Sequence, residues 1–146
     1  MTTCTRRIQF CAGHRVYGHE SKCANLHGHN YVAMVTAAAE CLDGIGRVID
    51  FSVLKDRVGG WIDDNWDHGM VLWVNDKATI DAVSGLAGTC NGSQKLFLLP
   101  TNPTAENMAE HLVTQVCPVL LRGTGVVVES VELWETENCK ATYVRK

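Results

Sequence analysis

The chain contains 146 residues, of which 46% are apolar and 20% are charged. This composition is typical of one compact domain spanning 1–146 and excludes an intrinsically disordered chain. The formal net charge is −3, and Lys and Arg form no block, so we expect no direct binding to nucleic acid. No apolar run approaches the roughly 20 residues of a membrane span, and no signal-peptide pattern is present, so we expect a cytoplasmic protein that does not bind membranes.

The strand and helix signals of the first half come in a simple order. A strand over 7–14 alternates apolar and polar residues, which places Ile8, Phe10, Ala12 and His14 on one face. A loop rich in Gly, His and Asn leads to a second strand over 27–41. A helix is expected to follow Phe51, with Ser52 as its N-terminal cap.

The second half is predicted to contain a short helix, a surface loop, a short strand, a long amphipathic helix and a β-hairpin. The corresponding ranges are 77–87, 88–94, 95–99, 104–121 and 125–145. Strands at both ends of the chain with helices between them indicate an α+β fold, in which helices pack on one face of an antiparallel sheet.

The cysteines indicate a reducing compartment. They are odd in number and lack paired spacing, a pattern that favours free thiols, most of them small core residues. The seven positions are Cys4, Cys11, Cys23, Cys41, Cys90, Cys117 and Cys139. At most one or two of these thiols are expected to carry chemistry.

Three of the six histidines are placed to bind a metal. His27 and His29 are two residues apart, so both rings leave the same face of an extended segment. His14 ends the apolar face of the preceding strand, and an antiparallel return brings it opposite them. Three imidazoles that converge on one point suit Zn²⁺ with a fourth position left for substrate. Each histidine alone is more often a hydrogen-bonded core or loop residue, and only the combined spacing favours a metal site. We interpret His19 and His111 as such residues, with His111 on the polar side of its helix.

Cys23 and the pair Asp67-His68 are candidates for proton transfer. Cys23 precedes His27 by four residues, so it is either a fourth ligand that closes a structural zinc site or a free thiol with a lowered pKa. A carboxylate next to an imidazole prepares the imidazole to exchange a proton with such a thiol. This pair is also common on solvated loops, so it favours catalysis only in combination with the other residues.

Two glutamates complete the set of candidates. Glu135 follows the apolar alternation of Val131 and Leu133, so it either points inward, where a ligand with an NH/NH₂ edge such as a pterin would pair with it, or lies in solvent at the strand end. Glu106 lies in the first turn of the long helix, where a surface glutamate is favoured by the helix dipole.

Several segments together resemble the 6-pyruvoyltetrahydropterin synthase family, and the resemblance extends over almost the whole chain. The C-x3-HGHNY block at 23–31 is its most specific part. The others, in the order of the family, are FCAGHR at 10–15, VIDF at 48–51, DH at 67–68, NPTAEN at 102–107 and WET at 134–136.

The resemblance implies roles for the candidate residues. It implies that His14, His27 and His29 bind catalytic Zn²⁺, and that Cys23, Asp67 and His68 form a proton-transfer triad. It further implies that Glu135 anchors the pterin ring and that Thr104 and Glu106 lie near the pterin pocket. The implied architecture is the tunnelling fold, whose subunits join their sheets into a barrel, usually in a homohexamer with active sites between subunits.

The short spacing between Cys23 and the HGH block resembles the branch of the family that makes 6-carboxytetrahydropterin from 7,8-dihydroneopterin triphosphate for queuosine biosynthesis. The alternatives are the 6-pyruvoyl reaction, which stops at triphosphate elimination, and a non-catalytic oligomeric module with a Cys-His₃ zinc site. The chain departs from the family at Trp66, where leucine is frequent, and in the long segment 76–99, which is expected to shape the mouth of the pocket.

Overall fold

The fold is built on one mixed β-sheet. The computed structural model describes residues 1–86 and 92–146, so Cys90 and most of the predicted loop at 88–94 lie outside the described residues. In the described part the sheet has six strands in the order β4-β3-β1-β2-β5-β6. Their bounds are Thr2–His14 for β1, His27–Ala39 for β2, Gly69–Trp73 for β3, Leu96–Leu99 for β4, Val127–Thr136 for β5 and Cys139–Val144 for β6.

The central hairpin of β1 and β2 sets the strand register at the middle of the sheet. These strands pair antiparallel along their full length, from Thr2 opposite Ala39 to His14 opposite His27. Strands β5 and β6 extend the sheet from β2 in the same antiparallel manner. On the other side, β3 runs parallel to β1 and β4 runs parallel to β3. The sheet is therefore mixed, not wholly antiparallel, and β3 is a strand that the sequence pattern did not predict.

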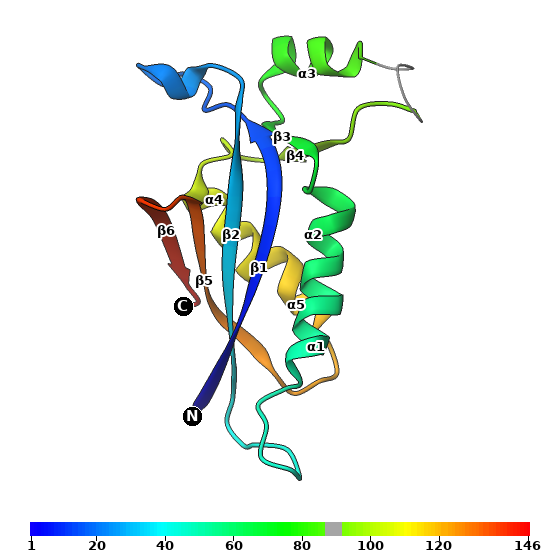
Figure 1. The fold of residues 1–146 in the computed structure, drawn as a ribbon, viewed down its shortest axis with the longest axis vertical. Coiled ribbons are helices and arrows are strands. Elements are labelled where there is room, and N and C mark those ends of the chain that lie inside the picture. Colours follow the sequence, from blue (N-terminus) through cyan, green and yellow to red (C-terminus); the bar gives the residue numbers. More distant parts are fainter. Residues whose placement is uncertain (87–91) are drawn as a thin grey trace.

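Two long helices cover one face of the sheet (Figure 1). The first comprises α1 (Phe51–Leu54) and α2 (Gly60–Asn65), joined by a π-helical segment, and the second comprises α4 (Ala105–His111) and α5 (Cys117–Leu120), joined in the same way. This confirms the predicted α+β fold with helices on one face, the tunnelling-fold subunit. The shorter α3 (Lys77–Ser84) lies beyond the end of the sheet.

The helix caps follow ordinary hydrogen-bonding rules. The side chain of Asp50 accepts a hydrogen bond from the Ser52 amide and caps α1, so the prediction of Ser52 as the cap is wrong by two residues. Thr104 caps α4 by accepting from the Asn107 amide at 3.2 Å. An oxygen from Asp or Thr satisfies an amide that has no partner within the first helical turn.

The core lies between the helices and the inward face of the sheet. Its largest fully buried members include Leu54, Ile62, Trp66, Met108, Leu112 and Leu133. The six cysteines in the described residues are all unpaired, as predicted, but only Cys117 is fully buried, so the interpretation of most cysteines as core residues is wrong. None of the described helices is long and apolar enough to span a membrane.

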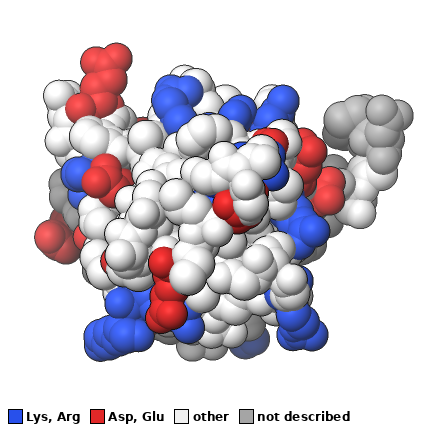
Figure 2. Space-filling model, turned by 90° about the horizontal axis from the view of Figure 1, so that it is seen from below, with Lys and Arg blue, Asp and Glu red and all other residues white. Residues whose placement is uncertain are grey.

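Charge is mixed on the end of the molecule that lies at the bottom of Figure 1. Figure 2 shows Lys and Arg groups separated from one another and interspersed with Asp and Glu. No continuous basic surface forms among the described residues on this face, in keeping with the absence of a basic block in the sequence.

Candidate functional site

The end of the β1–β2 hairpin brings three histidines together. Because β1 and β2 pair antiparallel, His14 lies opposite His27, and Ala12 lies opposite His29. The Nε2 atoms of His14 and His27 are 3.1 Å apart, and one ring nitrogen from each of the three histidines falls within 4.8 Å of the others. These three side chains form a group on one face of the hairpin that could hold a metal ion.

Backbone carbonyls fix two of the rings. His14 Nδ1 donates to the Pro103 carbonyl at 2.7 Å, and His27 Nδ1 donates to the Asn25 carbonyl at 2.6 Å. Since a carbonyl only accepts, each Nδ1 carries the proton and each Nε2 presents a lone pair. Two lone pairs 3.1 Å apart repel each other, and a shared cation removes that repulsion. The Nε2 of His29 is buried without a partner, so the donor set fits a metal ion.

The surroundings favour the neutral form of His14 and His29, the form that can bind a metal. Burial lowers the pKa of His14 to about 4, partly opposed by its hydrogen bond to Pro103 and assisted by the neighbouring His27 and His29. Burial also lowers the pKa of His29, while the Glu135 carboxylate opposes the shift. At neutral pH, His14 is therefore unprotonated and available as a ligand.

Glu135 faces the histidine group. Its carboxylate oxygens lie 3.9 Å from His14 Nε2 and 3.7 Å from His29 Nε2. Of the two orientations that the sequence left open, the structure places it inward, in a cavity that also contains Cys23, Thr104 and Glu106. Five of the predicted site residues, with His14 among them, therefore line one cavity.

Cys23 lies in a short 3-10 turn, Lys22–Ala24, and is partly buried. Among the described residues, the group of donors close enough to share a metal ion consists of His14, His27 and His29 and does not include Cys23. The geometry therefore corresponds to an open three-histidine site and not to the closed Cys-His₃ alternative.

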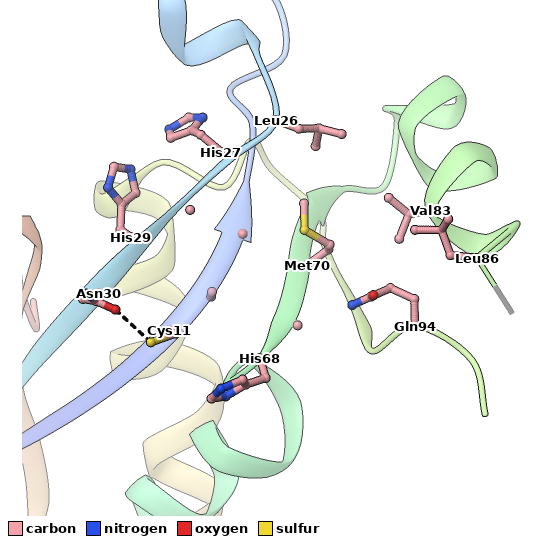
Figure 3. A pocket seen from close by; sticks show the side chains of 14 residues that line it. Cys11, Leu26, His27, His29, Asn30, His68, Met70, Val83, Leu86 and Gln94 are labelled. Atoms are coloured by element: carbon pink, nitrogen blue, oxygen red, sulfur yellow. Dashed lines mark hydrogen bonds between the residues drawn. The ribbon is translucent and has the colours of Figure 1, made fainter. Parts of the chain in front are cut away.

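His68 lines a different cleft, which Figure 3 shows with His27 and His29 on β2 at one side and His68 on the other. His68 Nδ1 donates to Asp67 Oδ2 at 2.7 Å, and the Cys11 amide donates to Asp67 Oδ1 at 2.9 Å. The His68 side chain is 79% exposed. Its Nε2 is left free to accept a proton. In one chain, Cys23 and His68 line separate cavities, so a single chain does not bring the predicted triad together.

The sequence did not predict the contacts in which backbone groups take part. The Pro103 and Asn25 carbonyls orient the histidines, yet any residue carries a carbonyl, so no residue type signals this role. Asn102 holds the segment before α4 by a reciprocal pair of 2.8 Å hydrogen bonds with the backbone of Tyr17. Lys95 contacts the turn that carries Asp67. Its position as the first residue of the predicted strand 95–99 gave no indication of that contact.

Known proteins resemble the chain over nearly its full length. A 6-carboxy-5,6,7,8-tetrahydropterin synthase of Rickettsia bellii (strain RML369-C) is 44% identical over 139 residues, which cover 95% of this chain and 97% of that protein. An enzyme of the same name from Aquifex aeolicus (strain VF5) is 33% identical over 158 residues, covering 95% of each chain.

Solved structures share the fold at low identity. An uncharacterised protein from Wolinella succinogenes superposes with a TM-score of 0.80 at 22% identity, covering 99% of this chain and 98% of that one. The 6-pyruvoyl tetrahydropterin synthase of Caenorhabditis elegans superposes with a TM-score of 0.68 at 23% identity, covering 99% and 96%. The family model described as 6-pyruvoyl tetrahydropterin synthase matches residues 3–146. Together with the 44% identical relative, this match shows that the chain belongs to the 6-pyruvoyl tetrahydropterin synthase family.

Proposed function

We propose that this protein is a zinc-dependent pterin synthase and a lyase of queuosine biosynthesis. It converts 7,8-dihydroneopterin triphosphate and one water molecule to 6-carboxy-5,6,7,8-tetrahydropterin, acetaldehyde and triphosphate. The relatives named 6-carboxy-5,6,7,8-tetrahydropterin synthase support the product. The observation that carries the proposal is the group of three histidine donors left open beside Glu135 and Cys23. The reaction requires no redox cofactor, because oxidation of the side chain balances reduction of the ring.

In the proposed enzyme, His14, His27 and His29 would hold the zinc ion. When bound, Zn²⁺ supplies a Lewis acid and a template for the hydroxyl groups of the substrate side chain. The protein contributes neutral imidazoles, oriented by the Pro103 and Asn25 carbonyls. These hydrogen bonds fix the tautomers and make the donor nitrogens more basic.

Cys23 and His68 move protons on and off the carbons of the substrate side chain. His68 accepts or donates a proton at Nε2, because its Nδ1–H is engaged by Asp67 at 2.7 Å. The carboxylate holds the ring in one orientation and stabilises the imidazolium that forms after proton uptake. Cys23 is the second group proposed to exchange protons with these carbons.

Glu135 anchors the pterin. Its two oxygens match the adjacent NH and NH₂ groups of the pterin edge, a bidentate pairing stronger than a single neutral hydrogen bond. Thr104 and Glu106 line the same cavity from the start of α4. Their position supports a contribution to the pterin pocket.

The complete site forms between subunits of a homo-oligomer. The separation of Cys23 and His68 into two cavities of one chain supports this arrangement, since a neighbouring copy can supply the missing half of each triad. A closed ring of copies repeats the same contact at each interface. We propose a homohexamer, the assembly that the family resemblance implies.

Two other functions are alternatives to this proposal. The 6-pyruvoyl reaction, which ends with triphosphate elimination, is supported by the description of the matching family model. A non-catalytic zinc module is disfavoured, because Cys23 lies outside the metal-binding group.

A product assay tests the proposal. Purified zinc-loaded protein is incubated with 7,8-dihydroneopterin triphosphate, and the pterins and acetaldehyde are identified by mass spectrometry. We expect 6-carboxytetrahydropterin together with acetaldehyde. Formation of 6-pyruvoyltetrahydropterin would assign the enzyme to the other reaction of the family, and no turnover by folded, zinc-bound protein would overturn the proposal.

A further inference from the structure

Lys95 connects the long segment 76–99 to the turn that carries Asp67 and His68. Its Nζ donates to the Asp63 carbonyl at 2.8 Å and to the Asp67 carbonyl at 2.6 Å. Asp63 belongs to the last turn of α2, where carbonyls lack helical partners and a cation is favoured by the helix dipole. One ammonium group therefore joins the end of a helix to the residue that orients His68.

The turn it contacts has a backbone that few residues adopt. His68 has a φ of +57°, the sole positive φ of a non-glycine residue in the described parts of the chain. A side chain in this left-handed region is strained and persists only where its neighbours impose it. The His68 amide donates to the Cys11 carbonyl at 2.7 Å, and the Cys11 amide holds Asp67. Strand β1 thus fixes one side of the turn, and Lys95 fixes the other.

The stem of Lys95 packs against Gly69. A Cβ added to Gly69 would lie 2.9 Å from Lys95 Cδ and 3.0 Å from Cγ, so the stem lies directly against the backbone of that glycine. The Met70 amide donates to the Lys95 carbonyl at 3.0 Å. These contacts follow from the parallel pairing of β3 with β4, in which Met70 lies opposite Leu96.

The positive charge of Lys95 also favours the ionised form of Asp67. Burial tends to raise the pKa of Asp67, but the hydrogen bonds from Cys11 and His68 and the nearby charges of His68 and Lys95 bring it below its usual value. Asp67 therefore remains an ionised acceptor for the Nδ1–H of His68.

We propose that Lys95 is a positioning residue that holds the Asp67-His68 pair in the geometry in which His68 presents Nε2 to the cleft. The kinetic part of this inference rests on the proposed function of His68 in proton transfer. Without the ammonium group, two carbonyls lose their donor and the turn is free to leave its strained conformation. The hydrogen bond from His68 to Asp67, and with it the tautomer of His68, then changes.

The test compares Lys95→Met with the wild-type enzyme in the zinc-loaded state. Methionine retains an unbranched stem against Gly69 and removes the charge. Side-chain ¹⁵N NMR without substrate should show an Nδ1-protonated His68 in the wild type and a mixture of tautomers in the variant. In the assay with 7,8-dihydroneopterin triphosphate, kcat should fall roughly ten- to a hundredfold while KM changes by less than about twofold, as expected for a misplaced catalytic group.

Two further variants make the test specific. Lys77→Met removes an exposed lysine from the same segment and should leave both the His68 tautomer and kcat at wild-type values. Lys95→Arg keeps a cationic donor and should restore part of the kcat lost in Lys95→Met. In the wild type, the Nζ protons of Lys95 should exchange slowly with solvent, a readout that does not depend on whether a variant folds.

The inference is overturned if Lys95→Met keeps the wild-type tautomer and kcat, or if it lowers only the melting temperature. Rapid exchange of the Lys95 Nζ protons in the wild type would overturn it as well. A wild-type enzyme with no turnover, but with a His68 tautomer that responds to Lys95→Met, would reject the proposed function and leave the positioning role intact.

Discussion

The histidines of the candidate site differ in what each should contribute. His29 provides one of the three converging nitrogens, whereas His68 lies in another part of the cleft. Both histidines line the same cleft. Substituting each one in turn therefore distinguishes the residue that binds the metal from the residue that transfers protons.

We expect His29→Ala to lower the zinc content from about one ion per subunit to nearly none, because two imidazoles do not hold Zn²⁺ in a site of this kind. His68→Ala should retain its zinc and lose turnover by roughly 10²- to 10⁴-fold, the usual contribution of a general acid–base. Metal analysis by mass spectrometry and steady-state kinetics check both. Full zinc content in His29→Ala would contradict the assignment of the ligands.

Substitution of Glu135 should lower the affinity for pterin far more than it lowers the stability of the fold. Glu135→Gln keeps the shape but removes the charge and one acceptor, so pterin affinity should fall about ten- to a hundredfold, as for a hydrogen bond to a charged group. Isothermal titration with a non-reacting pterin measures the affinity, and thermal unfolding measures the stability. Glu129→Gln, on the same strand, serves as the control. Equal affinities of wild type and Glu135→Gln would remove the anchor assignment.

At the scale of elements, the helix that carries His111 packs differently from its sequence pattern. His111 was interpreted as lying on the polar side of the helix. In the structure it is half-buried among aromatic rings, with centroid distances of 5.5 Å to Phe97, 6.1 Å to Trp61 and 6.3 Å to Trp66. The residues that surround it come from α2 and β4, which a helical periodicity alone does not reveal.

This packing predicts a pH-dependent stability. Burial lowers the pKa of His111, so the unfolded chain takes up a proton more readily than the folded one. The stabilising contribution of neutral His111 should be complete above the ordinary histidine pKa and should be lost as the pH falls below it. Urea unfolding at pH 8 and pH 5 should show a smaller pH effect in His111→Phe than in the wild type, with His19→Gln as the matched control. An unchanged pH effect in His111→Phe would contradict this prediction.

Local periodicity predicted most of the helices and strands, because strands alternate apolar and polar residues whereas helices carry an apolar stripe. The alternation from Ile8 to His14 predicted β1, and the apolar stripe after Thr104 predicted the helix at 104–121, found as α4, α5 and the π-helical segment between them. The structure also extends β1 back to Thr2 and ends β2 at Ala39. Strand β3 was missed because it is short and its buried residues, including Val71 and Leu72, do not alternate.

Parallel pairing was beyond the reach of the sequence pattern. The neighbours of β3 are β1 and β4, and the contacts depend on how distant segments cross, not on local propensity. The same reason explains why His14, His27 and His29 were predicted as one group while Lys95 was not. The hairpin register follows from alternation in two neighbouring strands, but the position of Lys95 follows from the addition of a strand at the edge of the sheet.

At the scale of the whole molecule, shared active sites predict complementation between inactive subunits. Cys23→Ala and His68→Ala should each be inactive alone, since each removes one member of the proposed triad. If Cys23 and His68 of one site come from different subunits, mixed oligomers contain some sites with both wild-type residues. Random mixing of equal amounts should then restore about a quarter of wild-type activity per site in a symmetric assembly.

The measurement uses the two variants denatured together, refolded with zinc and assayed, with each variant refolded alone as the control. Size-exclusion chromatography with light scattering should show a hexamer in every sample. A mixture that stays as inactive as its components would contradict a site built from two subunits.

The pairing of β1 with β2 has a consequence for how errors in folding are detected. Alternate residues of a strand face opposite sides, so a slip by one residue would turn His27 and His29 away from the helices together with Tyr31 and the apolar residues beyond it. The same slip would empty the core and scatter the ligands. Only chains whose central hairpin is correctly aligned would therefore bind zinc, so metal binding would selectively stabilise the correct register.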